Sequence, residues 1–150
     1  MRKGFSMLMA IAVIIVMATI AAFVMSLSGK VVKTTTVQYQ REQAILYAKS
    51  YTEFAIMAVQ AHSRAANCVQ TIKGTIGTLS DGGYRVRTHI SYIGTPAEIG
   101  TCPANRQLGT VIPGRGTPLT VIIDAYVDYR DLDHPDSMNY TVHRRTVQKI

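Results

Sequence analysis

The stretch FSMLMAIAVIIVMATIAAFVMSL, residues 5–27, dominates the sequence because it contains no charged residue. Only Ser6, Thr19 and Ser26 carry polar side chains within it. As a helix it would be about 35 Å long, which is enough to cross a hydrocarbon core of roughly 30 Å. A single segment in lipid must satisfy its own backbone hydrogen bonds, and only a helix does so. The sequence therefore predicts a transmembrane helix.

Basic residues flank this apolar stretch unequally. Arg2 and Lys3, together with the α-amino group, precede it, and Lys30 and Lys33 follow it. The positive-inside bias therefore favours a cytoplasmic N-terminus and an exported C-terminal domain. Two other interpretations remain open: a secretory signal that is cleaved at the small residues of 26–29, and a signal anchor that is never cleaved.

The helical pattern continues beyond the apolar stretch, since no glycine or proline occurs between Lys30 and Lys73. Apolar side chains recur at spacings of three and four, and Lys49 and Glu53 form an i,i+4 pair of opposite charge on another face. The apolar stripe comprises Ala44, Ala48, Tyr51, Ala55 and Ala58, joined by Tyr47 and Phe54. We expect one helix from about Phe5 to about Ala66, with this stripe packed on a sheet.

Alternating side chains predict three strands in the C-terminal half. The first follows the turn signal at 81–83: Tyr84, Val86, Thr88, Ile90 and Tyr92 alternate with Arg85, Arg87, His89 and Ser91. A long irregular loop rich in glycine and proline is expected at 94–118, then a second strand at 119–128. After a turn at 131–137, the third strand spans 139–147. One antiparallel sheet with a solvated face fits this pattern.

The expected fold class is therefore α+β, with a long N-terminal helix packed on a small antiparallel sheet. Residues 5–27 form the transmembrane part of the helix and residues 28–66 its amphipathic continuation. Residues 67–150 form the exported globular domain, which is the one domain that a chain of 150 residues has room for.

The net charge of +7 does not by itself indicate a nucleic-acid partner. The basic residues are scattered, and no recognised nucleic-acid motif accompanies them. Arg85 and Arg87 share one strand face, and Arg144 and Arg145 lie on another strand. If those strands are neighbours, the sheet presents a basic patch to phosphates, and a merely solvated face is the simpler interpretation.

Cys68 and Cys102 are the only cysteines in the chain. An even number of cysteines in an exported domain favours a disulfide. Such a bond would tether the glycine- and proline-rich loop to the end of the helix. Two free thiols are the alternative, and no CxxC motif or Cys/His cluster indicates a metal site.

Three carboxylates lie close together at Asp131, Asp133 and Asp136. Loops rich in oxygen ligands can hold Ca²⁺, but the glycine and the terminal glutamate of an EF-hand are missing. An acidic hairpin turn is the simpler interpretation, and no cofactor is expected.

The sequence offers no convincing catalytic constellation. The histidines are far apart in sequence, at His62, His89, His134 and His143. Neither a G-x-S-x-G nor an HExxH motif occurs, so we do not expect an enzyme.

The residues Met1-Arg2-Lys3-Gly4-Phe5-Ser6-Met7-Leu8, followed by the long apolar stretch, resemble the N-terminus of the type IV pilin and type II secretion pseudopilin family. The resemblance implies a leader at residues 1–4, which prepilin peptidase removes by cutting between Gly4 and Phe5, with methylation of the new N-terminal Phe5. It also implies that residues 5–27 anchor the protein in the bacterial inner membrane and then form the core of a fibre. The family's fold, a long helix on a small antiparallel sheet, agrees with the periodicity.

The chain departs from the family pattern at Met9, where most members have a glutamate that pairs with a neighbouring subunit's N-terminal amine. In the family, the absence of this glutamate is associated with a subunit at the fibre tip, so a minor or initiating subunit is favoured. The family's proline near the helix middle is also absent, with Ser26 near that place, and a straighter helix is expected.

The leading hypothesis is thus a structural subunit of a type IV pilus or a type II secretion pseudopilus, with other subunits, prepilin peptidase, the inner-membrane assembly platform and membrane lipid as partners. An uncleaved, membrane-anchored periplasmic binding module is one alternative. A DNA-uptake pilin is another, although the sequence does not favour nucleic acid as a partner.

Overall fold

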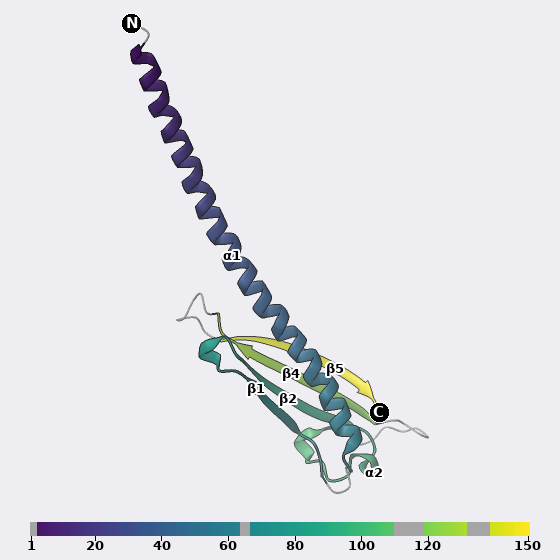
Figure 1. The fold of residues 1–150 in the computed structure, drawn as a ribbon. Coiled ribbons are helices and arrows are strands. Elements are labelled where there is room, and N and C mark those ends of the chain that lie inside the picture. The colour runs from purple at the N-terminus through teal and green to yellow at the C-terminus, as the bar shows by residue number, and fades with distance from the viewer. Residues whose placement is uncertain (1–2, 64–66, 110–118, 132–138) are drawn as a thin grey trace. The chain divides into compact units, whose positions relative to one another are not determined.

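A computed structural model describes residues 3–63, 67–109, 119–131 and 139–150. The chain divides into two compact units, Met1–Tyr39 and Gln40–Ile150. The structure confirms the predicted α+β class, since a long N-terminal helix, α1 (Lys3–Ala61), packs its C-terminal part on a small sheet (Figure 1).

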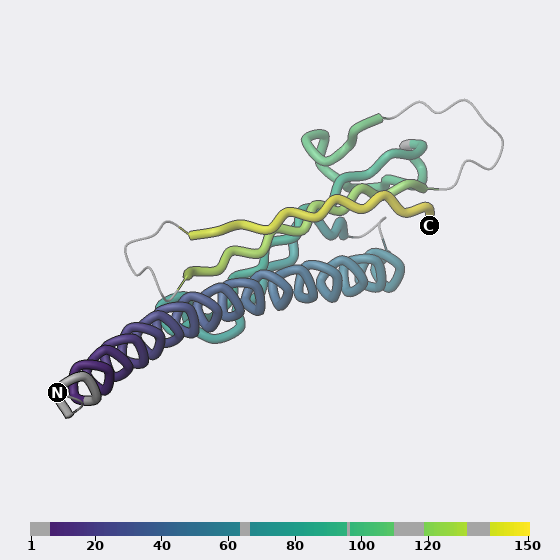
Figure 2. Tube along the Cα trace, turned by 90° about the horizontal axis from the view of Figure 1, so that it is seen from above, coloured from purple at the N-terminus to yellow at the C-terminus, as the bar shows by residue number. Residues whose placement is uncertain are grey.

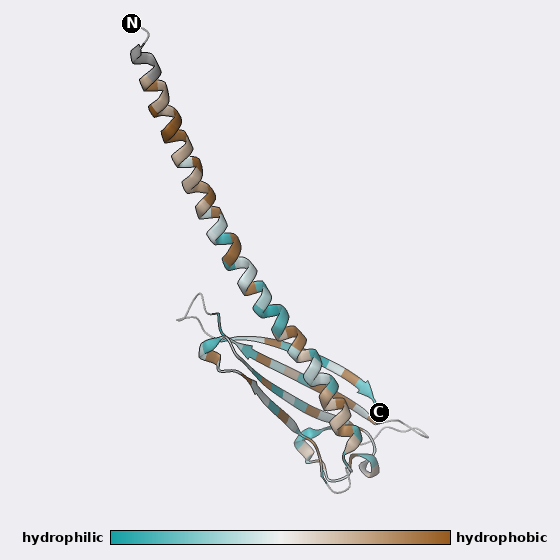
Figure 3. Ribbon diagram, in the orientation of Figure 1, coloured by the Kyte–Doolittle hydropathy of each residue, from teal (hydrophilic) through white to brown (hydrophobic). Residues whose placement is uncertain are grey.

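The first unit consists of the N-terminal part of α1. Its side chains from Met7 to Leu27 are exposed, and they include nearly all of the large apolar residues of this part of the helix. Figure 3 shows this part of α1 as the most hydrophobic run of the chain. A helix that is apolar on every side has no polar face to turn toward water, which is the pattern of a helix surrounded by lipid or by other apolar helices.

The second unit contains a sheet whose strand order is β1 (Thr71–Ile76), β2 (Tyr84–Ile93), β4 (Thr120–Tyr129) and β5 (Tyr140–Lys149). These strands pair antiparallel, so that β1 and β5 form opposite edges (Figure 1). The short strand β3 (Gln107–Gly109) pairs parallel to the end of β2. Short helical turns lie in the connections, η1 (Leu79–Asp81), α2 (Pro96–Ile99) and η2 (Ala104–Arg106).

The core lies between α1 and one face of this sheet, which we call the inner face. Small residues of the helix, Ala44, Ala48 and Ala55, are fully buried there, and their size lets the helix approach the strands closely. The inner face supplies the alternate residues of β2 and β4 that the sequence predicted, namely Tyr84, Val86, Thr88, Ile90, Tyr92, Leu119, Val121, Ile123, Ala125 and Val127. The predicted alternation in these two strands is confirmed.

The side chain of Tyr51 on α1 packs directly against Gly74 in β1. A Cβ atom added at this glycine would overlap the hydroxyl and ring atoms of Tyr51 on α1. Glycine fits this position because the tyrosine ring occupies the space of a side chain, and any larger residue would force the ring to move. Tyr51, a member of the predicted apolar stripe, is thus packed against the sheet as expected.

The structure corrects several details of the sequence analysis. The helix ends at Ala61 rather than near Ala66, and β1 and β3 were not predicted. Phe54, which was assigned to the packed stripe, is 51% exposed, whereas Thr52 is buried in the helix face that meets the sheet. The reason is that the contact face is narrow and runs through Ala48, Thr52, Ala55 and Val59, which leaves Phe54 on the flank of the helix.

Candidate interaction surfaces

The first candidate surface is the exposed apolar part of α1. Of the described helices, this is the one that is long and apolar enough to span a membrane; its most apolar window of 18 residues has a mean hydropathy of 2.8 and is not buried within the chain. A membrane anchor fits these properties. A signal sequence near an N-terminus meets the same criteria of length and hydropathy.

One polar side chain of this surface, that of Thr19, is satisfied within the helix. The Thr19 hydroxyl donates a hydrogen bond to the Val16 carbonyl oxygen at 2.8 Å. A threonine that bonds back to its own helix leaves no unpaired donor in an apolar environment. The Thr19 hydroxyl is thus compatible with an apolar environment.

One side of the same segment carries a shallow, entirely apolar depression with a volume of about 340 Å³. It is lined by Met9, Ala12, Val13, Val16, Met17 and Ile20. The small side chain of Ala12 leaves room for a neighbouring apolar helix to approach. Gly4 and Phe5, the residues of the expected processing site, both lie within the helical backbone of α1, and Met9 is exposed.

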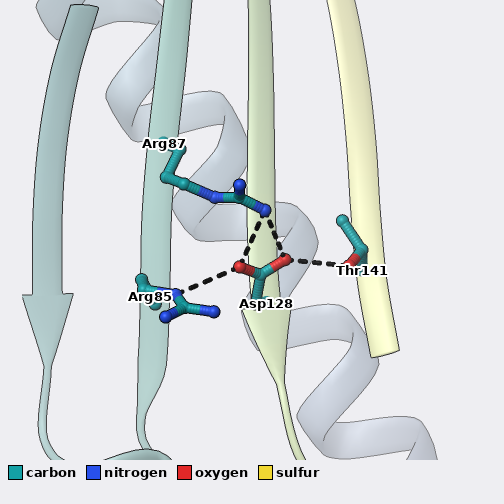
Figure 4. Close-up of polar contacts among 4 residues, drawn as sticks. All are labelled: Arg85, Arg87, Asp128 and Thr141. Carbon is teal, nitrogen blue, oxygen red and sulfur yellow. Dashed lines mark hydrogen bonds and ion pairs between the residues drawn. The ribbon is translucent and has the colours of Figure 1, made fainter. Parts of the chain in front are cut away.

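The second candidate surface is the face of the sheet that points away from α1, which we call the outer face. Its centre is Asp128 of β4, which is only 2% exposed. The guanidinium groups of Arg85 and Arg87 donate to its carboxylate at 3.0–3.2 Å, and the Thr141 hydroxyl donates at 2.8 Å (Figure 4). Burial raises the pKa of Asp128, but the Thr141 hydrogen bond and the Arg87 charge outweigh it and hold the pKa below its usual value. Asp128 is therefore an anion that joins three strands.

A second carboxylate, Asp124, organises the other half of the outer face. Arg145 donates to both of its oxygens, at 2.7 and 3.0 Å, and His143 Nε2 donates to one of them at 2.8 Å. The Arg145 hydrogen bonds lower the pKa of Asp124. The His143 ring stacks on Tyr126, with ring centroids 4.4 Å apart. Two strands, β4 and β5, are thus cross-linked by paired charge and by aromatic stacking.

His89 lies beside these groups on β2. Its Nδ1 is 3.2 Å from an Arg106 guanidinium nitrogen, and because arginine is always a donor, Nδ1 accepts this hydrogen bond. Burial, together with the charges of Arg106 and Arg87, lowers the pKa of His89. A neutral imidazole at this position anchors η2 to β2. It thereby also holds the segment that leads into β3.

The basic patch that the sequence raised as a possibility is only partly present. Strands β2 and β5 are not neighbours, since β4 lies between them, and Arg144 faces the inner side. Arg85, Arg87 and Arg145 instead bind the two aspartates of β4. The arginines of the outer face are therefore engaged within the sheet rather than held ready for phosphates.

The disulfide expected between Cys68 and Cys102 is present. It joins the segment that follows α1 to the segment between α2 and η2, and both cysteines pack against the hydrophobic core. Closing a loop over a sequence separation of 34 residues contributes about 4 kcal/mol to stability in the chain-entropy model.

The calcium hypothesis finds no support in the described residues. Asp131 is buried, while Asp133 and Asp136 lie outside the described residues. Within the described ranges, no group of three or more His, Cys, Asp or Glu side chains could hold a metal ion. Two histidines, His89 and His143, come close together on the outer face, with the ring of Tyr126 between them. His62 is not part of this group, because it directly follows the end of α1.

The sequence analysis does not identify Asp124 and Asp128 as members of a site, although the sequence contains a pattern that indicates one. Asp124 and Asp128 occur at solvent-side positions of a strand, and arginines occur at alternate positions of the predicted strand before it. The sequence did not say which strands pair, and only pairing brings Arg85 opposite Asp128 and Arg145 opposite Asp124.

Comparison of the chain with protein-family models, with curated proteins and with solved structures found no match.

Proposed function

We propose that the protein is a membrane-anchored structural subunit of a fibre of the type IV pilus or type II secretion pseudopilus kind. The proposal is based on the two parts of α1. Residues 7–27 of this continuous helix are uncharged and exposed, and its C-terminal part packs on the sheet. Such a helix needs lipid or other apolar helices around it.

The two environments correspond to two stages. Before assembly, the apolar part of α1 holds the subunit in the membrane with the sheet domain exported. In the fibre, the same surface packs against the α1 helices of other subunits. The absence of charge from Phe5 to Leu27 suits both stages, because an unpaired charge is costly in either apolar environment.

Met9 favours a minor or initiating subunit over a major one. At this position an apolar side chain replaces the carboxylate that pairs with a neighbour's N-terminal amine in related fibres. A methionine leaves no buried carboxylate in need of a partner. A subunit at the fibre tip has no neighbouring N-terminal amine to pair with, so a methionine in place of the carboxylate removes no interaction.

The proposal is tested by the N-terminal mass of the full chain purified from its native membrane. We expect a chain that starts at Phe5 and carries one additional methyl group. An intact Met1, in cells with active prepilin peptidase, would overturn the proposal and leave an uncleaved, anchored periplasmic binding module. A start near Gly29 would instead identify a cleaved secretory signal.

A matched pair of variants makes the test specific. Gly4→Val should abolish the shortening, since the family's peptidase cuts after a glycine, whereas Ser6→Ala, two residues away, should leave it unchanged. Loss of processing in both variants would argue against recognition of Gly4.

A further inference from the structure

Strand β5 leaves one edge of the sheet open over its full length. It pairs with β4 along its ten residues, and no other described strand pairs with it (Figure 2). An open edge presents backbone N–H and C=O groups that can pair with an additional strand. The edge is therefore a possible place for an extended polypeptide to add to the sheet.

A groove runs beside this edge, between β5 and α1, with a volume of about 520 Å³. The sheet extends past the helix here, so the inner-face residues of β5 are largely exposed. The groove is lined by Arg41, Ile45, Ala48, Tyr129, Tyr140, Thr141, Val142, His143 and Arg144. A strand added to β5 would place alternate side chains in this groove.

The charge of the groove selects among occupants. Arg41 lines it from α1 and Arg144 from β5, and the ion pairs found among the described residues include neither of them. By contrast, Arg145, the next residue of β5, is bound to Asp124 on the outer face. Two arginines in one groove, beside the stacked rings of Tyr129 and Tyr140 with centroids 5.7 Å apart, favour an occupant with carboxylates.

The same charges disfavour a second copy of the chain as the occupant. Residues directly opposite in an antiparallel pair lie on the same face of the sheet. If two β5 strands paired about a twofold axis near the strand centre, Arg144 would face Arg144, or Arg145 would face Arg145. Like charges directly opposite each other are destabilising, so the edge resists self-pairing.

We propose that β5 and its groove bind an extended acidic segment of another protein, which adds to the sheet as a further antiparallel strand with its carboxylates facing Arg41 and Arg144. Main-chain hydrogen bonds along β5 supply affinity, and the two arginines supply the preference for acidic residues. This inference concerns the sheet domain and does not depend on the proposed fibre function.

The test uses the full chain in detergent micelles and a labelled synthetic peptide of alternating valine and threonine, with two glutamates at its central inward-facing positions. We expect saturable binding by fluorescence anisotropy, with slower amide hydrogen exchange in β5. The double variant R41E/R144E should bind roughly tenfold more weakly, because two attractive contacts become repulsive. A peptide with lysines in place of the glutamates should show the reverse preference.

Two matched controls separate strand addition from simple charge attraction. K73E reverses one charge on β1, at the opposite edge, as each half of R41E/R144E does in the groove, and should leave binding unchanged. A peptide N-methylated at every second residue on the side facing β5 keeps its charge but cannot donate to the edge, and it should not bind.

Several outcomes would overturn the proposal. They are equal binding of the N-methylated peptide, equal weakening by K73E, no binding at the peptide's solubility limit, or self-association of the chain through β5. Should R41E/R144E fail to fold by circular dichroism, comparing the glutamate and lysine peptides on the unmodified chain still decides the matter.

Discussion

At the scale of single residues, Asp128 does most to define the outer face. Its carboxylate is buried in a sheet face that is otherwise partly exposed, and it receives hydrogen bonds from β2 and β5 at once. A buried carboxylate is tolerated only when its oxygens are paired and hydrogen-bonded. Arg85, Arg87 and Thr141 meet that requirement, and in doing so they connect the central strand to both of its neighbours.

Asp128→Asn should destabilise the sheet domain by about 2 kcal/mol, because it removes the charge that both arginines bind and alters the acceptors. Chemical denaturation at pH 7, with the full chain in detergent, measures this difference. Glu53→Gln is the matched control. The Glu53 side chain is exposed, and the pair with Lys49 that the spacing predicts is not among the ion pairs of the described residues, so its loss should have little effect.

The pH dependence of this difference has a definite sign. The pKa of Asp128 is lower in the folded protein than its ordinary value of 3.8. A depressed pKa contributes stability that is present above the unfolded value and is lost as the pH falls through the folded value. The gap between Asp128→Asn and the unmodified chain should therefore narrow below about pH 4; a gap that widened on acidification would contradict the role assigned to Asp128.

At the scale of elements, the position of α1 on the sheet depends on small residues. Buried alanines line the helix, and Gly74 faces Tyr51 from the neighbouring strand. The ring of Tyr51 lies where a side chain on β1 would otherwise project. The observed contact of Tyr51 with the edge strand therefore depends on the absence of a Cβ atom at position 74.

Gly74→Ala should destabilise the domain by about 1 to 2 kcal/mol, because the added methyl group overlaps the Tyr51 ring and forces it to move. The thermal unfolding midpoint should fall accordingly. In a Tyr51→Leu background the cost should shrink, since the overlapping ring is gone, and a double-mutant cycle measures that coupling. Equal costs in both backgrounds would show that the overlap is not the cause. Gly29→Ala, where an added Cβ meets no atom within 4 Å, is the control.

At the scale of the whole molecule, the chain combines a part that folds around a buried core with a part whose apolar side chains are exposed. Residues 40–150 bury their apolar side chains between α1 and the sheet, whereas residues 7–27 leave theirs exposed. An uncharged apolar helix of this length is stable only in an apolar environment. Residues 7–27 therefore have the length and hydropathy of a membrane anchor, which the sheet domain does not share.

Val16→Lys places a charge at the middle of the apolar stretch and should shift the full chain from the membrane fraction toward the soluble or degraded fraction. A lysine at a helix centre costs about 2.5–3.5 kcal/mol on insertion scales. Fractionation with alkaline extraction measures the shift, and Val16→Ala, which adds no charge, should behave as the unmodified chain. Equal membrane recovery of Val16→Lys would show that residues 7–27 do not hold the protein in the bilayer.

Much of the architecture could be predicted from local patterns. The uncharged run at 5–27 predicted a helix that the structure leaves unburied, and the alternation in residues 84–92 and 119–127 predicted which side chains meet the core. The two cysteines predicted the disulfide that is present. Each of these depends on residue type and on a period of two or 3.6, which are properties of the chain itself.

Tertiary structure alone decided the features that depend on which segments become neighbours. Strand β1 was missed because it is short, with a glycine at its centre, and it is held by pairing with β2 rather than by its own propensity. The end of α1 at Ala61 has no local glycine or proline, so the packing that follows decides where the helix stops.

The charge network also depends on which strands are neighbours. Asp128 binds Arg85 because β2 lies beside β4. Arg144 lies in an open groove because β5 has no second partner strand among the described residues. The sequence determined which residues are apolar, charged or bonded by a disulfide, and strand pairing decided which of them meet.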